Sequence, residues 1–212
     1  MKNKKRVITW VVILVIAVLL FAGYNLYRYP ALFRSLSDQS LDEEAVNTLR
    51  EEIAANEDKQ ILVAYFSYSG TTRGVAEALS EKIGADLFEI APQEEYTNVY
   101  LQSNHEIRTH ARPALAQGVE NIDSYDIIMV GYPVWWHATP APIQSFLESY
   151  DLTGKLIIPF CTSGGSDIEE TMPTFLDSCS GLAVYGERLI SSTTQIDAWL
   201  EDLNQNLNIS KL

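Results

Sequence analysis

From residue 61 onward, short runs of apolar residues alternate with stretches in which apolar residues recur every three or four positions. The apolar runs predict five strands, at 61–66, 86–90, 126–131, 155–160 and 182–185. The periodic stretches predict helices at 72–84, 98–116, 140–149, 167–179 and 193–207. This alternation favours an α/β fold, in which helices cover both faces of a doubly wound, five-stranded parallel sheet.

Two of the predicted strands contain continuous apolar runs, as expected for central strands that are buried on both faces. They contain Ile127-Ile128-Met129-Val130 and Leu156-Ile157-Ile158. In such sheets, ligands bind beyond the carboxyl ends of the strands, where the winding of the chain reverses. The topology therefore predicts a binding site at the loops after the first, third and fourth strands.

The N-terminus has a different pattern. Residues 7–27 carry no charged side chain, and as a helix they would span about 30 Å, the thickness of the hydrocarbon core of a bilayer. The basic residues before this segment, which favour a cytoplasmic N-terminus, are Lys2, Lys4, Lys5 and Arg6. We therefore predict a single-pass anchor at 1–28 in the cell membrane and an extracytoplasmic domain.

A cleaved signal peptide is the alternative interpretation of the same segment. Its apolar part would usually be about 7–15 residues long and would end in a small-x-small cleavage site. The apolar run here is longer, and no Ala-x-Ala motif follows it. A retained anchor is favoured.

Residues 29–60 form a predicted linker between the anchor and a globular domain at 61–212. Ser40-Leu41-Asp42-Glu43 has the form of a helix capping box. A weak apolar stripe follows on an otherwise acidic segment, so we predict a short stalk helix in this linker.

The charge balance narrows the range of partners. The chain has 15 Lys and Arg against 28 Asp and Glu, for a formal net charge of −13, and four of the basic residues precede position 7. Nucleic acid is excluded as a partner because a phosphate backbone requires a basic surface.

The cysteines and histidines do not have the spacing of a metal site. Cys161 and Cys179 fit either one disulfide or two small buried side chains. The histidines, at positions 105, 110 and 137, are too scattered to suggest bound zinc.

The first candidate loop is Ser67-Tyr68-Ser69-Gly70-Thr71-Thr72, between the first strand and the first helix of the domain. Backbone N–H groups at the start of a helix and nearby hydroxyls are suitable donors for a phosphate. The loop lacks the lysine of a P-loop, which favours a single terminal phosphate over a nucleoside triphosphate. An ordinary serine-rich turn is the alternative.

The second and third candidate loops follow the third and fourth strands. The second contains Pro133-Val134-Trp135-Trp136-His137, and indole rings on a loop favour packing inward or against a flat ligand. The third contains Thr162-Ser163-Gly164-Gly165, whose glycines allow the backbone to approach a planar group, although a tight turn would use them too.

In this order and on these strands, the three loops resemble those of the short-chain flavodoxin-like proteins. The resemblance runs from Ile61 to about Leu207. It implies non-covalent FMN, with the first loop on its phosphate and the other two lining the isoalloxazine ring. The residues that it identifies as cofactor-binding are Ser67, Tyr68, Ser69, Gly70, Thr71, Thr72, Pro133, Val134, Trp135, Trp136, His137, Thr162, Ser163, Gly164 and Gly165.

His137 departs from the family pattern, which usually has glycine or another small residue at this position. One hypothesis is that this histidine reaches the flavin and makes its potential depend on pH near 6–7. The other is a partly exposed loop histidine that caps the helix after Pro140.

The resemblance implies an electron carrier, in which the flavin supplies the chemistry and no side chain is catalytic. Its partners would be a redox protein or a small-molecule electron donor or acceptor, and the membrane through the N-terminal helix. The alternatives are an FMN-dependent NAD(P)H or quinone oxidoreductase, with residues 92–121 walling a second pocket, and a flavin-free interaction module. A Cys-x5-Arg phosphatase is excluded because Asp167 stands where the arginine would be.

Overall fold

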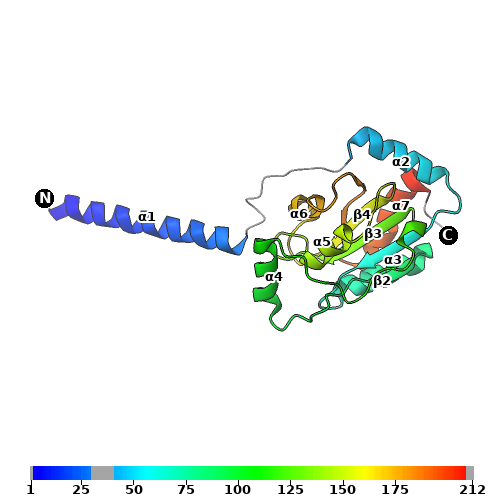
Figure 1. Ribbon diagram of the computed structural model, residues 1–212. Helices are drawn as coiled ribbons and strands as arrows, with labels where there is room; N and C mark the ends of the chain where they lie inside the picture. Colours follow the sequence, from blue (N-terminus) through cyan, green and yellow to red (C-terminus); the bar gives the residue numbers. More distant parts are fainter. Residues whose placement is uncertain (1, 30–40, 209–212) are drawn as a thin grey trace.

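The computed structural model describes residues 2–29 and 41–208. Its first element is α1 (Lys2–Arg28), a long helix that extends away from the rest of the protein (Figure 1). Residues Arg6–Arg28 are long and apolar enough to cross a membrane, with a mean hydropathy of 2.7 and no part of that window buried. A signal sequence meets the same criterion, so the helix alone is weak evidence for an anchor.

The remaining elements form an α/β fold with a parallel sheet. The strands are β1 (Ile61–Tyr65), β2 (Asp86–Glu89), β3 (Ile127–Pro133), β4 (Leu156–Thr162), β5 (Ala183–Val184) and β6 (Arg188–Leu189). The helices are α2 (Glu43–Ala55), α3 (Thr71–Ile83), α4 (Val99–Thr109), α5 (Ala141–Glu148), α6 (Met172–Leu176) and α7 (Ile196–Leu207).

The strand order is β2-β1-β3-β4-β5, which confirms the predicted doubly wound sheet. The fifth strand is interrupted. β5 pairs with β4 at Leu156 and Ile157, and β6 resumes the pairing at Phe160 and Cys161. Between β5 and β6, Gly186 has φ +67°, a left-handed conformation that glycine adopts without steric cost.

Each face of the sheet carries its own apolar core. Side chains at alternate positions of β1, β3 and β4 pack against α2, α3 and α7 on one face, and those between them pack against α5 and α6 on the other. β4 is buried at every position and β3 at every position except its last. The continuous apolar runs of the sequence follow from this burial on both sides.

The predicted stalk helix is present as α2. Its N-cap is Asp42, whose side chain accepts a hydrogen bond from the backbone N–H of Ala45; Ser40 of the predicted capping box lies outside the described residues. Val46 and Ile53 are buried against α7 and the sheet, so α2 forms part of a helical layer.

Two predicted helices are shorter than the periodicity suggested. The one expected at 98–116 ends at Thr109, and His110 caps it in a left-handed conformation. Residues 111–114 have no regular secondary structure, and the residue before Pro113 disfavours helix. The one expected at 167–179 consists of a 3-10 turn, Ile168–Glu170, and the five residues of α6.

A pair of glycine substitutions tests this packing. A Cβ at Gly131 would lie 2.2 Å from Cζ of Phe160, whereas one at Gly74 would meet nothing within 4 Å. We expect Gly131→Ala to lower the free energy of unfolding by about 1–3 kcal/mol, through overpacking. Gly74→Ala should raise it by about 0.5–1 kcal/mol, because alanine loses less entropy in a helix.

Urea unfolding of the full chain in detergent, followed by tryptophan fluorescence, measures both changes. Equal midpoints for Gly131→Ala and the wild-type chain would show that the Phe160 ring moves aside freely.

Candidate functional site

The three candidate loops meet at the carboxyl edge of the sheet, as the parallel topology requires. The hydroxyls of Thr72 and Thr162 lie 2.9 Å apart and are buried, which joins the first loop to the third. The backbone N–H of Val134 donates to the carbonyl of Thr162 at 3.0 Å, which joins the second loop to the third. The sequence-predicted residues are thus held together by hydrogen bonds between loops.

The first loop presents donors to solvent at the start of α3. Gly70, the N-cap residue, has φ +89° and provides no capping side chain. Ser67 Oγ accepts from the Gly70 N–H at 3.1 Å, and the hydroxyls of Ser69 and Thr71 lie 3.2 Å apart. An exposed helix N-terminus without a capping side chain, flanked by hydroxyls, suits an anion.

Arg73 does not reach back to this loop. Its guanidinium forms an ion pair with Glu89, at the end of the neighbouring strand β2. The first loop therefore relies on neutral donors and on the helix dipole rather than on a cationic side chain.

The second loop turns sharply at two consecutive left-handed residues. Trp136 has φ +55° and His137 has φ +60°, and Trp135 and Ala138 exchange both backbone hydrogen bonds across the turn. Such conformations cost non-glycine residues about 1–3 kcal/mol each. Glycine would adopt the same conformation at position 137 without this cost.

The turn sends the two adjacent indoles to different surroundings. Trp135 lies edge-on to the rings of Phe66, Tyr68 and Tyr96, with centroids 5.1, 6.0 and 5.4 Å away. Trp136 faces α4, where its Nε1 donates to Ser103 Oγ at 2.9 Å. Trp135 therefore faces the first loop, and Trp136 is held by α4.

His137 is paired with a carboxylate from the next loop. Its Nδ1 contacts Glu170, and this hydrogen bond holds the pKa of Glu170 below its ordinary value. Pro140 is the N-cap residue of α5 and receives no side-chain cap, so the suggestion that His137 caps this helix was wrong.

The third loop is folded around the side-chain hydroxyl of Ser163. Ser163 Oγ accepts from the N–H groups of Gly165 at 3.2 Å and Ser166 at 2.8 Å. The backbone around Gly164 is thereby folded into a compact, exposed edge.

Cys161, just before this loop, and Cys179 are both buried, and neither forms a disulfide. Of the two interpretations of the cysteines, the structure supports two buried side chains. Burial raises the pKa of the Cys161 thiol to about 12, so that this group stays protonated and unreactive.

The end of α1 also reaches the second loop, which the sequence did not lead us to expect. The Arg28 guanidinium lies over the Trp136 ring, 5.0 Å from its centroid. The Asn104 side chain donates to the carbonyl of Arg28 at 3.2 Å, and the rings of Tyr29 and His137 meet edge to face at 4.7 Å. The only sequence signal was the position of Arg28 and Tyr29 directly after the apolar segment.

A cavity of about 360 Å³ opens among these groups. Tyr68, Val134, Trp135 and Trp136 line it on the side of the candidate loops. α1 contributes Arg28, and α4 contributes Val99, Tyr100 and Ser103. The cavity is thus enclosed by the aromatic loop, by α4 and by a residue of the N-terminal helix.

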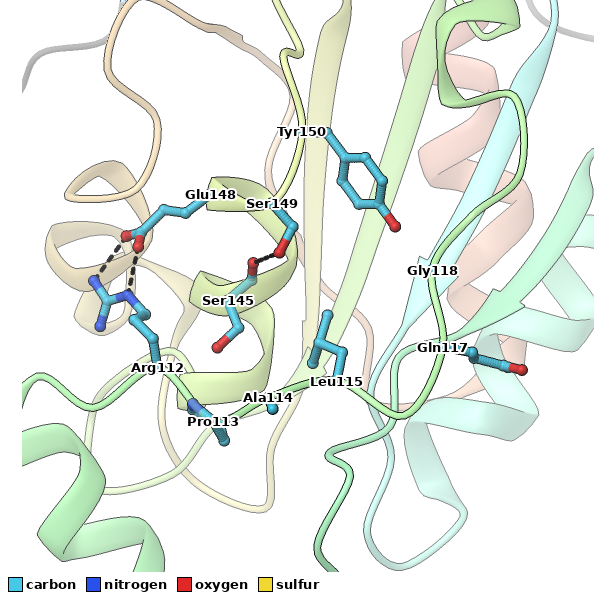
Figure 2. A pocket seen from close by; sticks show the side chains of 10 residues that line it. All are labelled: Arg112, Pro113, Ala114, Leu115, Gln117, Gly118, Ser145, Glu148, Ser149 and Tyr150. Atoms are coloured by element: carbon cyan, nitrogen blue, oxygen red, sulfur yellow. Dashed lines mark hydrogen bonds and ion pairs between the residues drawn. The ribbon is translucent and has the colours of Figure 1, made fainter.

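The segment 92–121 walls a separate pocket of about 610 Å³, beside α5 and without any of the candidate loop residues (Figure 2). Its charged groups are paired with each other. Arg112 makes two contacts of 2.8 Å with Glu148, which also accepts from Ser178. Residues 112–118 of the predicted wall therefore line a pocket apart from the three loops, whereas its α4 part lines the cavity beside them.

Comparison with known proteins places this arrangement in a family. A family model described as Flavodoxin matches residues 60–203. No curated protein matches the chain significantly. Solved structures do match it, and the matches cover nearly the whole length of those proteins.

A protein from Bacteroides eggerthii DSM 20697, provisionally named a flavoprotein, is 38% identical, with a TM-score of 0.63 over 69% of this chain and 98% of its own. One from Bacteroides uniformis ATCC 8492, named in the same way, is 33% identical, with a TM-score of 0.63 over 68% and 98%. A flavoprotein from Lactobacillus acidophilus NCFM, solved in complex with FMN, is 26% identical, with a TM-score of 0.57 over 67% and 99%. The sheet, the three loops at its carboxyl edge and the family match together show that this chain belongs to the flavodoxin family.

Proposed function

We propose that this flavodoxin transfers electrons at a membrane surface, with FMN held across the three loops. FMN is its cofactor by family, and a relative has been solved with FMN bound. The observation that carries the proposal is the joining of the three loops by the Thr72–Thr162 and Val134–Thr162 hydrogen bonds. FMN, when bound, supplies one- and two-electron chemistry, and the protein supplies binding and tuning.

The roles of the residues follow from their positions. The phosphate would be held by the exposed hydroxyls of Ser69 and Thr71 and by the backbone N–H groups at the start of α3, which has no capping side chain. Tyr68 and Trp135, which line the 360 Å³ cavity, would contact the ring from one side. The backbone around Gly164 would approach it from the other, since glycine has no side chain to keep it away.

The N-terminal helix supports a membrane location for this chemistry. The apolar window of α1 is exposed along its length, and basic residues precede it. The positive-inside rule favours a cytoplasmic N-terminus and an extracytoplasmic domain. Because Arg28 contacts Trp136 at the end of that helix, the flavin site would face the membrane plane.

Substitutions in the first loop test the phosphate site. We expect Ser69→Ala and Thr71→Ala each to raise the dissociation constant for FMN about tenfold, since each removes a hydrogen bond to a charged group. Thr48→Ala, which removes an exposed hydroxyl from α2, is the matched control and should bind FMN normally. The dissociation constants of the three variants are measured by the quenching of FMN fluorescence on adding the full chain in detergent.

If both loop variants bind as tightly as the wild-type chain, the phosphate lies elsewhere. A full chain that stays colourless after incubation with FMN would instead favour the flavin-free interaction module.

The His137–Glu170 pair predicts two different effects on the midpoint potential. An imidazole changes charge between pH 5 and 8, whereas Glu170, with its lowered pKa, stays ionised throughout that range. On the hypothesis that this histidine faces the flavin, His137→Ala should change the slope of the midpoint potential against pH. Glu170→Gln removes a constant negative charge, so it should raise the potential by a similar amount from pH 6.5 to 8.

Spectroelectrochemical titration of the loaded protein from pH 5 to 8 measures both curves. Identical slopes for the wild-type chain and His137→Ala would refute a role for this histidine in tuning.

Cysteine labelling tests the topology, because both native cysteines are buried. Lys4 and Glu57 are exposed residues on either side of the apolar segment. In intact cells, an impermeant maleimide should label Glu57→Cys, and should label Lys4→Cys only after permeabilisation. The opposite pattern would place the domain in the cytoplasm, and loss of α1 from the mature mass would indicate a cleaved signal peptide.

A further inference from the structure

A second pocket, of about 470 Å³, lies between the end of α1 and α4. Tyr24, Tyr27 and Arg28 line it from α1, and Asn104 and Arg108 are among the residues that line it from α4. It lies entirely outside the three loops of the flavodoxin site, except for Trp136 of the second loop. One of its walls, formed by Tyr24, Tyr27 and Arg28, precedes the matched family domain, which begins at residue 60.

The lining combines aromatic rings with cations. The Arg108 guanidinium lies over the Tyr27 ring, 4.2 Å from its centroid, as Arg28 lies over Trp136. A stacked guanidinium still directs its N–H groups outward in its own plane, where they can donate hydrogen bonds. In Arg28, Nε and Nη1 donate to the hydroxyls of Tyr29 and Tyr24, so Nη2 is the nitrogen left for a ligand. No carboxylate is present among the described residues that line the pocket. Such a lining suits a flat, uncharged ring that carries carbonyl oxygens.

The pocket adjoins the proposed flavin cavity. Both cavities are lined by Arg28, Tyr100 and Trp136, and Tyr68, Val134 and Trp135 lie on the flavin side of these shared residues. A ring bound in this pocket would therefore be separated from the flavin cavity by no more than the shared side chains.

The pocket also lies where the apolar helix ends. The candidate membrane span is Arg6–Arg28, so its last turn forms one wall of the pocket. Tyr24 and Tyr27 stand at this end, as aromatic residues do at the interface of a bilayer. Tyr100 and Leu101 of α4, which are 73% and 66% exposed, extend the aromatic and apolar surface beside it. A ligand dissolved in the membrane would reach the pocket without crossing water.

We propose that this pocket binds the head group of a membrane quinone, which accepts electrons from FMN; the proposal rests on the proposed function of the flavin site. The quinone gains two electrons and two protons and leaves as the quinol, while reduced FMN loses the same two electrons and two protons. A soluble redox donor then reduces FMN again. Arg28 and Arg108 donate hydrogen bonds to the two carbonyl oxygens, and Tyr27 and Trp136 enclose the ring.

A binding measurement tests this without turnover. The full chain, with FMN oxidised, is placed in nanodiscs of zwitterionic lipid and titrated with decylubiquinone, and quenching of tryptophan fluorescence is recorded. The background is Trp10→Phe, because Trp10 is exposed on α1 and would be quenched by quinone anywhere in the bilayer. We expect saturable quenching, with a dissociation constant about tenfold higher in Arg108→Ala and in Tyr27→Ala.

The matched control is Arg50→Ala. Arg50 also lies over a tyrosine ring, that of Tyr185 at 4.9 Å, but on α2 and outside the pocket. This variant should bind decylubiquinone like the wild-type chain.

Anaerobic reoxidation of photoreduced FMN by the same quinone gives the second readout. The rate should saturate with quinone concentration, and Arg108→Ala should raise the half-saturating concentration about tenfold at an unchanged FMN content.

The following outcomes would overturn the proposal. Quenching that does not saturate, or that all variants share, would show that quinone does not bind in this pocket. Loss of quenching on adding phosphatidylglycerol would identify the pocket as a lipid head-group site. A yellow protein that reduces no quinone would leave the flavin site standing and refute this partner, whereas a chain that holds no FMN would refute the proposed function itself.

Discussion

The site depends on one constraint, the meeting of parallel strands at a common edge. β1, β3 and β4 are adjacent in the sheet although long stretches of chain separate them, so the loops that follow them converge. The buried Thr72–Thr162 contact and the Val134–Thr162 hydrogen bond convert this convergence into a defined geometry. One of these buried hydroxyls donates to the other where water is excluded, so the hydrogen bond is costly to break.

Local backbone geometry then decides how the aromatic residues are used. With Trp136 and His137 both left-handed, the chain reverses within two residues, and the indoles of Trp135 and Trp136 separate. One packs among Phe66, Tyr68 and Tyr96, and the other is hydrogen-bonded to Ser103. The strain of the turn is offset by these contacts, because each ring is fixed on a different partner.

The same separation links the flavodoxin domain to the N-terminal helix. Since Trp136 faces α4 rather than the other loops, its ring is available to Arg28, and the carbonyl of Arg28 is held by Asn104. The domain thereby meets the end of the apolar helix at the face that carries the candidate loops. An independent tether would leave the orientation of the domain open, whereas these contacts turn its site toward the helix.

The sequence alone determined the doubly wound sheet, its apolar central strands, the three loops and the apolar helix. These features follow from local periodicity and from short motifs, which the chain carries wherever it folds. Periodicity did not predict the helix ends at Thr109 and near Ile168, because proline geometry and tertiary packing outweigh periodicity there. The pairing of His137 with Glu170, the divergence of the two indoles and the pockets at the end of α1 were decided only by the tertiary structure, because each joins residues that are distant in sequence or depends on a backbone angle that no motif specifies.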